Sequence, residues 1–466
     1  MGKDVDEVGY DLATQADLDR YAEVQQQLTQ MQAPLLLDTS NPHQRLYIAA
    51  MDGTENSVYQ DPPKEWSAVG KIYKQLDDIR PVGVVSGYVE GIGTQRNKLA
   101  AKWDSINGYS FDERLETAYY KFCVQAGAWL KEDPQAQIRV AGLGFSRGAE
   151  LSAALSRVIH ERGIMDPDDA KFQEKDGLIT QIEYTRGHLV QPGQTPQALM
   201  LFDPVATSVL EHDRRVAPSV LGALVLTARD EARDLFKGNR LIADGLTENG
   251  YFLNATVPGA HSDLGNTYPR NGLGVLSANL AVDYLNSLSN QDFLHKQTPP
   301  QQPEQYAIHR SYEHLPIYNT NGFHDGERDF IHQPGPKWQC KVEPQSDCTS
   351  KAPVGTALNA QIARQPVRIQ EVDAPPQIQS QDKTPTQASN DIEALFLRMS
   401  DAAMRGDHEA VLQVGRAYRE SSAGQAWLQQ GREYNQAQQE ALEQQMAQQQ
   451  AQQQTEAQRG PVMTMQ

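Results

Sequence analysis

A serine between two glycines is the first candidate for chemistry in this sequence. Ser146 lies in the stretch GFSRG, residues 144–148, which fits the pattern G-x-S-x-G. A serine hydroxyl becomes a nucleophile when a base takes its proton, and small neighbours let the chain turn sharply enough to present the oxygen. Because the pattern fixes only three positions, it is also compatible with a serine that has no catalytic role.

The segments on either side of Ser146 favour catalysis. The stretch AQIRVAGLGF, which precedes it, is a short apolar run typical of a buried strand. After it, apolar residues recur at helical spacing from Leu151 to Ile159, and Gly163 provides a stop for the helix. Ser146 is therefore predicted at a strand-to-helix turn, the geometry of a nucleophile elbow.

An acid and a base are expected downstream, because α/β-hydrolases place their triad in the order serine, acid, histidine. Asp203 follows the apolar stretch QALMLF and is predicted at the carboxyl end of a strand, with a turn-forming Asp-Pro as the alternative. His261 lies between a predicted strand and a predicted helix, and we expect it to be the base. His309 and His314 are rivals in a tyrosine-rich stretch that better fits a structural or substrate-lining role. The other downstream histidines are His212, His295, His324 and His332.

Ester hydrolysis also needs an oxyanion hole, made of backbone N–H donors after the nucleophile and after an early strand. Arg147 fills the first position, and Gly53 and Thr54, which follow the apolar stretch LYIAAM, fill the second. Asp-Gly-Thr is also an ordinary turn, and the sequence does not separate the two interpretations. This chemistry requires no metal or other cofactor. The acidic loop 166–169 is interpreted as a solvated turn, with a calcium site as the alternative.

The elements that must position these residues alternate along the chain. Apolar runs and helical patterns follow one another from about residue 46 to residue 288, which predicts parallel strands joined by helices. We therefore expect an α/β-hydrolase-like fold, a mostly parallel sheet flanked by helices, plus a small C-terminal helical module. The predicted parts are an N-terminal helical segment (1–40), a catalytic domain with cap elements (41–335), a disordered Pro/Gln-rich linker (336–389) and a helical module with a Gln-rich tail (390–466).

Composition excludes several classes of function. A formal net charge of −18 disfavours nucleic acid as a partner, because Lys and Arg supply most of the affinity for phosphates. Cys123, Cys340 and Cys348 are too few for a disulfide framework, although the last two could pair after export. The N-terminal sequence lacks the apolar region of a signal peptide, and no apolar run is long enough for a membrane helix. We expect synthesis in the cytoplasm and contact with any membrane from its surface.

Six motifs, taken in order, resemble one family. They are MDGTENS, GYVEGIGT, GFSRGAE, LFDPVA, RDEARDLF and VPGAHSDLGNTY, and they span about residues 45–288. This set is similar to the uncharacterised α/β-hydrolase domain shared with the first class of bacterial type VI lipase effectors. The resemblance assigns Ser146 as nucleophile, Asp203 as acid and His261 as base, in agreement with the order of residues along the chain.

The resemblance implies a serine ester hydrolase, a phospholipase A-like enzyme that forms an acyl-enzyme and acts as a secreted antibacterial effector. The implied partners are membrane phospholipid, a secretion apparatus, a chaperone and an immunity protein, and the implied route is secretion into target cells without a signal peptide. The alternatives are a soluble intracellular esterase or amidase on small substrates and a non-catalytic hydrolase-fold binding protein. The family commonly has an aromatic residue where Glu55 stands and a glycine where Asn266 stands.

Overall fold

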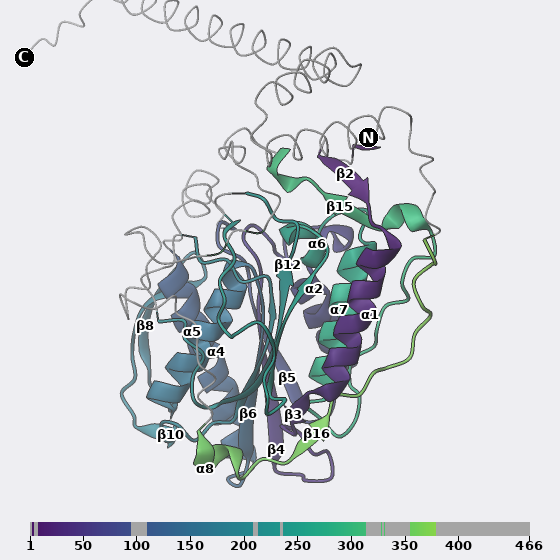
Figure 1. Ribbon diagram of the computed structural model, residues 1–466. Helices are drawn as coiled ribbons and strands as arrows, with labels where there is room; N and C mark the ends of the chain where they lie inside the picture. Colours follow the sequence, from purple (N-terminus) through teal and green to yellow (C-terminus); the bar gives the residue numbers. More distant parts are fainter. Residues whose placement is uncertain are drawn as a thin grey trace, which may run out of the picture. The chain divides into compact units, whose positions relative to one another are not determined.

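The structure is a computed structural model (Figure 1) that describes residues 2–3, 8–94, 110–207, 213–233, 236–313, 328, 330 and 355–378. These residues belong to one compact unit, Met1–Ile378. A second unit, Gln379–Gln466, lies outside the described residues, and so does the predicted helical module with its Gln-rich tail.

A seven-stranded sheet forms the centre of the first unit. Its strand order is β13-β14-β12-β11-β6-β4-β5, and neighbouring strands are parallel except for the edge pair β13 and β14. This mostly parallel sheet, flanked by helices, confirms the predicted α/β-hydrolase-like fold (Figure 1). The strands are β4 Gln44–Met51, β5 Val84–Val89, β6 Gln137–Phe145, β11 Gln197–Phe202, β12 Val220–Ala228, β13 Gly245–Leu246 and β14 Phe252–Val257.

Helices cover both faces of the sheet, with α4 and α5 on one face and α1, α2 and α7 on the other (Figure 1). The side chains of β4 alternate accordingly. Leu46 and Ile48 pack in the core with α1, α2 and α7, whereas Tyr47 and Ala49 pack with α4 and α5. The helices are α1 Gln15–Gln30, α2 Ala68–Ile79, α4 Phe111–Glu132, α5 Arg147–Arg162, α6 His261–Leu264, α7 Gly272–Asn286 and α8 Thr356–Asn359.

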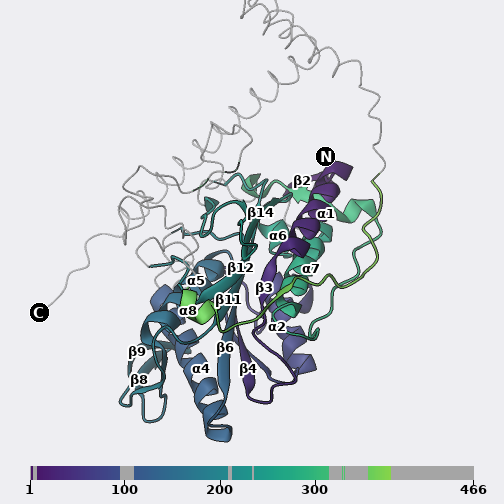
Figure 2. The same cartoon turned by 60° about the horizontal axis from the view of Figure 1, so that its bottom comes forward.

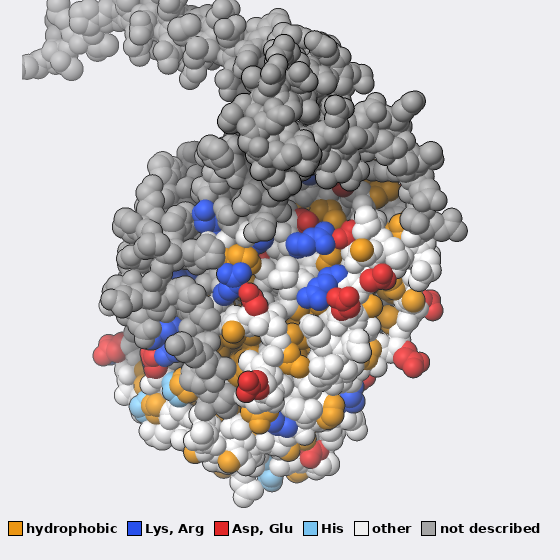
Figure 3. Space-filling view, viewed as in Figure 1, with side chains coloured by type: hydrophobic (Ala, Val, Ile, Leu, Met, Phe, Trp, Pro, Cys, Tyr) orange, Lys and Arg blue, Asp and Glu red, His pale blue; other side chains and the backbone are white. Residues whose placement is uncertain are grey.

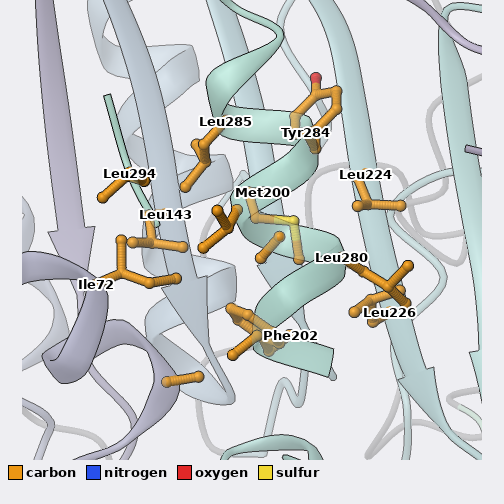
Figure 4. Packing of buried hydrophobic residues seen from close by; sticks show 14 of the residues in the cluster. Ile72, Leu143, Met200, Phe202, Leu224, Leu226, Leu280, Tyr284, Leu285 and Leu294 are labelled. Carbon is orange, nitrogen blue, oxygen red and sulfur yellow. The ribbon is translucent and has the colours of Figure 1, made fainter. Parts of the chain in front are cut away.

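Strands β11 and β12 are buried along their whole length. Parallel strands covered on both faces have continuous apolar sequences, which explains the apolar stretches QALMLF and ALVLTA. Figure 4 shows Leu280, Tyr284 and Leu285 of α7 on the face of the sheet that carries Met200 and Phe202 of β11. Close packing of this kind makes the sheet a firm support for the loops at its ends.

Smaller pairings surround the main sheet. A three-stranded sheet joins the N-terminal strands to β15, in the order β1-β2-β15, and three two-stranded pairings link β3 with β16, β7 with β10, and β8 with β9. Among the described residues, no helix has the length and apolarity needed to cross a membrane. The strands are β1 Gly2–Lys3, β2 Gly9–Leu12, β3 Gln32–Pro34, β7 Ile164–Met165, β8 Lys171–Lys175, β9 Leu178–Glu183, β10 His188–Val190, β15 Ala307–His309 and β16 Arg364–Pro366.

Residues 355–378, predicted as part of a disordered linker, are ordered in the first unit, so the prediction was wrong for this segment. Helix α8 buries Leu358, β16 pairs antiparallel with β3, and Val367 is buried directly after β16. The Arg364 guanidinium donates to the backbone oxygen of Gln32 at 2.7 Å. Figure 2 shows this segment in light green, from α8 past β3. A few apolar and backbone contacts hold this segment in place, although its polar composition predicts disorder.

The N-terminal helix also belongs to the first unit and does not form a separate segment ending at residue 40. Thr14 caps α1 with a capping box, in which its side chain and that of Asp17 each accept from the other's backbone N–H. The Tyr21 hydroxyl donates to the backbone oxygen of Pro258 at 2.9 Å, and Arg20 Nε donates to that of Thr256 at 3.0 Å. Helix α1 is thereby fixed to the carboxyl end of β14.

The strand order changes direction between β4 and β6, because β5 lies beyond β4 whereas β11, β12 and β14 follow β6 on the other side. In open α/β sheets, ligands bind at the carboxyl ends of the strands at such a point. Gly53 follows β4 and Ser146 follows β6, so two of the predicted site residues lie at this position.

Candidate active site

Ser146 lies at the turn between β6 and α5, as predicted. Its backbone has φ 60° and ψ −127°, a conformation that costs a non-glycine residue about 1–3 kcal/mol. The two flanking glycines allow this turn. A Cβ added at Gly144 would lie 2.5 Å from the backbone oxygen of Gly148, and one added at Gly148 would lie 2.3 Å from that of Met51. Larger residues are therefore excluded at both positions, and the turn has the form of a nucleophile elbow.

Asp203 lies beside this turn because β11 pairs in parallel with β6. Phe202 and Phe145 are register partners, and the Ser146 backbone N–H donates to the backbone oxygen of Phe202 at 3.0 Å. The Asp203 side chain is fully buried, and its Oδ1 accepts a hydrogen bond from the Ala228 backbone N–H at 2.9 Å. These contacts hold the carboxylate in one orientation and leave Oδ2 for other partners.

His261 is the first residue of α6, and its Nδ1 lies 2.6 Å from Asp203 Oδ2. Its ring stacks on that of Phe145, the residue before Ser146, with centroids 4.6 Å apart and an interplanar angle of 30°. A proton held between Nδ1 and Asp203 leaves Nε2 as the acceptor, which is the tautomer that a base for serine requires. The fold therefore brings Asp203 and His261 together beside the turn that carries Ser146.

The environment of His261 favours the neutral imidazole. Burial lowers its pKa below the ordinary value, although the hydrogen bond to Asp203 acts in the opposite direction. Phe145 on one face and Phe236, whose ring meets that of His261 edge-on at 5.1 Å, contribute to this burial. A neutral imidazole is the form that can accept a proton.

Three further charged residues, none of which could be assigned a role from the sequence, surround the Asp203–His261 pair. Glu231 Oε2 accepts from the His261 backbone N–H at 3.3 Å and from Arg233 Nη2 at 2.8 Å. Arg328 Nη2 donates to Asp203 Oδ2 at 3.0 Å, the same oxygen that contacts His261. Burial alone would raise the pKa of Glu231. The neighbouring Arg233, Arg328 and His261 have the opposite effect, and the pKa of Glu231 falls to about 2. Glu231 is therefore ionised at neutral pH and contributes a fixed charge to the site.

The predicted oxyanion residues lie together at the carboxyl ends of β4 and β6. Arg147 Nε donates to Thr54 Oγ1 at 2.8 Å, which ties the loop after β4 to the start of α5. The Gly53 backbone N–H donates to the Asp52 carboxylate at 2.8 Å, so this amide is already hydrogen-bonded. The Thr54 backbone N–H, in contrast, has no acceptor among the residues that the structure describes. Of the two loop positions, Thr54 fits an oxyanion donor better than Gly53.

Asp52 stabilises the loop after β4 through its buried side-chain carboxylate. Its Oδ1 accepts from the Ser67 hydroxyl at 2.5 Å, and its Oδ2 accepts from the Tyr88 hydroxyl at 2.6 Å. Burial raises the pKa of Asp52 to about 6, even though these hydrogen bonds and that of Gly53 favour the charged form. The carboxylate therefore links β4, β5 and the start of α2 below the predicted oxyanion loop.

The other candidates lie elsewhere or have other partners. His309 is buried with its Nδ1 2.5 Å from Asp263 Oδ1, and the His295 side chain is exposed. In the acidic loop, Arg186 forms ion pairs with Asp166, Asp168 and Asp169. His212, His314, His324 and His332 lie outside the described residues, as do Cys340 and Cys348.

The two residues that depart from the family pattern, Glu55 and Asn266, both have positive φ angles. Asn266 has φ 59°, and Glu55 has φ 64°. Asparagine adopts this left-handed conformation more readily than most residues, so it can replace the family's glycine at 266. Glu55 is held there by its backbone N–H, which donates to the backbone oxygen of Ile92 at 2.8 Å.

Residues 45–188 match the family model described as "T6SS, Phospholipase effector Tle1-like, catalytic domain". The resemblance to type VI phospholipase effectors is therefore confirmed. The matched segment contains Ser146 and the loop after β4, whereas Asp203 and His261 lie beyond it. No curated protein matches the chain.

Three solved structures show a distant likeness. An uncharacterized protein from Pseudomonas aeruginosa is 16% identical with a TM-score of 0.31, over 60% of this chain and 51% of that one. The Tle1 effector bound to the VgrG spike of the type 6 secretion system is 16% identical with a TM-score of 0.29, over 51% and 52%. An acetylxylan esterase is 10% identical with a TM-score of 0.20, over 53% and 99%. The chain thus matches about half the length of the first two proteins.

Proposed function

We propose, from the premise that this chain shares the Tle1-like catalytic domain of type VI phospholipase effectors, that it is a serine hydrolase that deacylates phospholipids. The observation that carries the proposal is the 2.6 Å contact between His261 Nδ1 and Asp203 Oδ2, beside a serine in a strained strand-to-helix turn. This arrangement supports nucleophilic catalysis, because it would supply a base of the right tautomer beside the turn that carries the serine.

In the first step, the Ser146 hydroxyl attacks the ester carbonyl while His261 Nε2 takes its proton. His261 then gives that proton to the leaving alcohol, and an acyl-enzyme remains. In the second step, His261 takes a proton from water, the resulting hydroxide attacks the acyl carbonyl, and Ser146 leaves as a hydroxyl. Asp203 orients the imidazole throughout and stabilises its charged form.

The backbone N–H groups of Arg147 and Thr54 would hold the oxyanion of each tetrahedral intermediate. One such donor is typically worth about 3–4 kcal/mol of transition-state stabilisation. The hydrogen bond from Arg147 Nε to Thr54 Oγ1 at 2.8 Å supports this assignment, because it fixes the two donor-bearing segments relative to each other.

One observation favours a phospholipid as the substrate, namely the family match to a phospholipase effector domain. On the face shown in Figure 3, Lys and Arg side chains are interspersed with Asp and Glu side chains. Arg229 and Arg310, for example, form ion pairs with acidic residues. The substrate class therefore rests on the family match.

The proposed delivery to a target cell is based on the same family match. As a type VI effector, the chain would be made in the cytoplasm, would bind a component of the secretion apparatus, and would act in a target cell. A chaperone and an immunity protein complete the proposed set of partners.

The substrate class is tested with purified full-length chain, phosphatidylethanolamine vesicles and soluble short-chain nitrophenyl esters. We expect fatty acid release from the vesicles, with products identified by mass. Hydrolysis of the short esters alone would replace the lipase proposal with the soluble esterase alternative. Hydrolysis of neither substrate would favour a binding protein with a hydrolase fold.

A further inference from the structure

A second buried Asp–His pair lies next to the first. His309 Nδ1 is 2.5 Å from Asp263 Oδ1, and the His309 backbone N–H donates to Asp263 Oδ2 at 3.0 Å. Both side chains are almost completely buried. The proposed hydrolytic steps use neither residue, so the pair needs another explanation.

The two pairs share one short helix, α6, which contains both His261 and Asp263. Asp263 Oδ2 also accepts from the backbone N–H of Ala260, the residue directly before His261, at 2.8 Å. The Asp263 carboxylate therefore stabilises the first turn of α6 through a hydrogen bond to the backbone of that turn. A four-residue helix has too few hydrogen bonds to hold its own geometry, so its position depends on contacts of this kind.

His309 is in turn fixed by its surroundings. It lies in β15, which pairs with β2 so that His309 and Tyr10 are register partners. The Tyr268 ring stacks on its imidazole with centroids 3.9 Å apart and an interplanar angle of 18°, and the Tyr268 hydroxyl lies 3.1 Å from Ser311 Oγ. The imidazole therefore connects the N-terminal sheet to α6.

We propose that His309 is a positioning residue of the hydrolytic reaction. With Asp263, it fixes the start of α6 and thereby the imidazole of His261 relative to Ser146. This inference rests on the proposed function. Its physical basis is that a misplacement of about 1 Å can lower a catalytic rate by about 100-fold. The strand β2, near the N-terminus, becomes part of the support for the catalytic histidine.

The test measures the rate at which a fluorophosphonate labels Ser146, together with kcat and KM on phospholipid vesicles. His309→Ala should lower the labelling rate and kcat by about 100-fold and leave KM nearly unchanged, because it frees His261 without altering contacts to lipid. His309→Asn should recover most of the rate, since its amide nitrogen can occupy the place of Nδ1. His295→Ala, which changes an exposed histidine, is the matched control and should behave as wild type.

His309→Gln provides a second comparison if His309→Ala does not fold. It keeps the size and the donor but moves the donor one bond farther from the backbone, so it should be slower than His309→Asn at equal thermal stability. A folded His309→Ala with the wild-type labelling rate, or equal rates for the Asn and Gln variants, would overturn the positioning role. Absence of labelling at Ser146 in the wild-type chain would instead refute the proposed function.

Discussion

At the scale of residues, the charges around His261 set its proton affinity. Burial and the positive charge of Arg233 lower the pKa of His261, whereas Asp203 raises it. The net effect is a pKa below the ordinary value. Glu231 is one of the groups that raise it. Because the imidazole must be neutral to act as a base, kcat/KM should fall as the pH falls through this pKa in the free enzyme.

Glu231→Gln should therefore move the acidic limb of the kcat/KM profile to lower pH. The change removes a negative charge near His261 and leaves the positive charge of Arg233, and both effects disfavour imidazolium. It should also destabilise the fold by about 3 kcal/mol, because Arg233 loses its buried partner. The measurement is a pH–rate profile with a denaturation curve, with Glu248→Gln, at an exposed position, as the control. A limb that stays in place or moves to higher pH would contradict the assigned electrostatics.

The sequence predicted only part of this site. Ser146, Asp203 and His261 could be proposed as a triad because each follows an apolar strand and their order along the chain matches that of a hydrolase. Glu231 occurs in the motif RDEARDLF, but its contact with His261 depends on how the loops after β12 and β14 meet. Arg328 is 125 residues from Asp203, and no local pattern indicates a contact over that separation.

At the scale of elements, the glycines around Ser146 determine the turn. Gly148→Ala would place a methyl group 2.3 Å from the backbone oxygen of Met51, and backbone cannot move away as a flexible side chain does. We expect a lower melting temperature and a kcat reduced by about 100-fold, because α5 and Ser146 must shift together. Gly187→Ala is the control, since an added Cβ there would meet nothing within 4 Å. Equal activity of the two variants would contradict the elbow geometry.

Strand positions were predictable because buried parallel strands are continuous apolar runs, as in β11 and β12. The pairing of β3 with β16 was not, because three-residue strands carry no periodicity that sequence can reveal. The same holds for β15, whose role depends on its pairing with β2, almost 300 positions away in the chain.

At the scale of the whole molecule, the first unit contains all the proposed catalytic residues, and the second unit begins at Gln379. Residues 355–378 belong to the first unit, where Leu358 and Val367 are buried. Hydrolysis should therefore depend on this segment and not on the residues after it.

Two truncated chains test this division. A chain that ends at Ser389 should hydrolyse lipid in vitro about as well as the full chain, and we expect it to lose delivery to a target cell. A chain that ends at residue 354 should have a lower melting temperature and lower activity, because it exposes the surface that Leu358 and Val367 cover. Lost hydrolysis in the longer truncated chain would make the second unit part of the enzyme, and normal delivery would contradict the expectation that delivery requires the second unit.

Fatty acid release by Ser146→Ala shows whether Ser146 is the nucleophile of an ester hydrolase, as we propose. The purified variant is compared with the wild-type chain on the same phospholipid vesicles, with circular dichroism to establish that both are folded. The variant should fold normally and lose almost all hydrolysis, because no other hydroxyl occupies the turn between β6 and α5. Wild-type turnover by a folded Ser146→Ala protein would contradict this proposal.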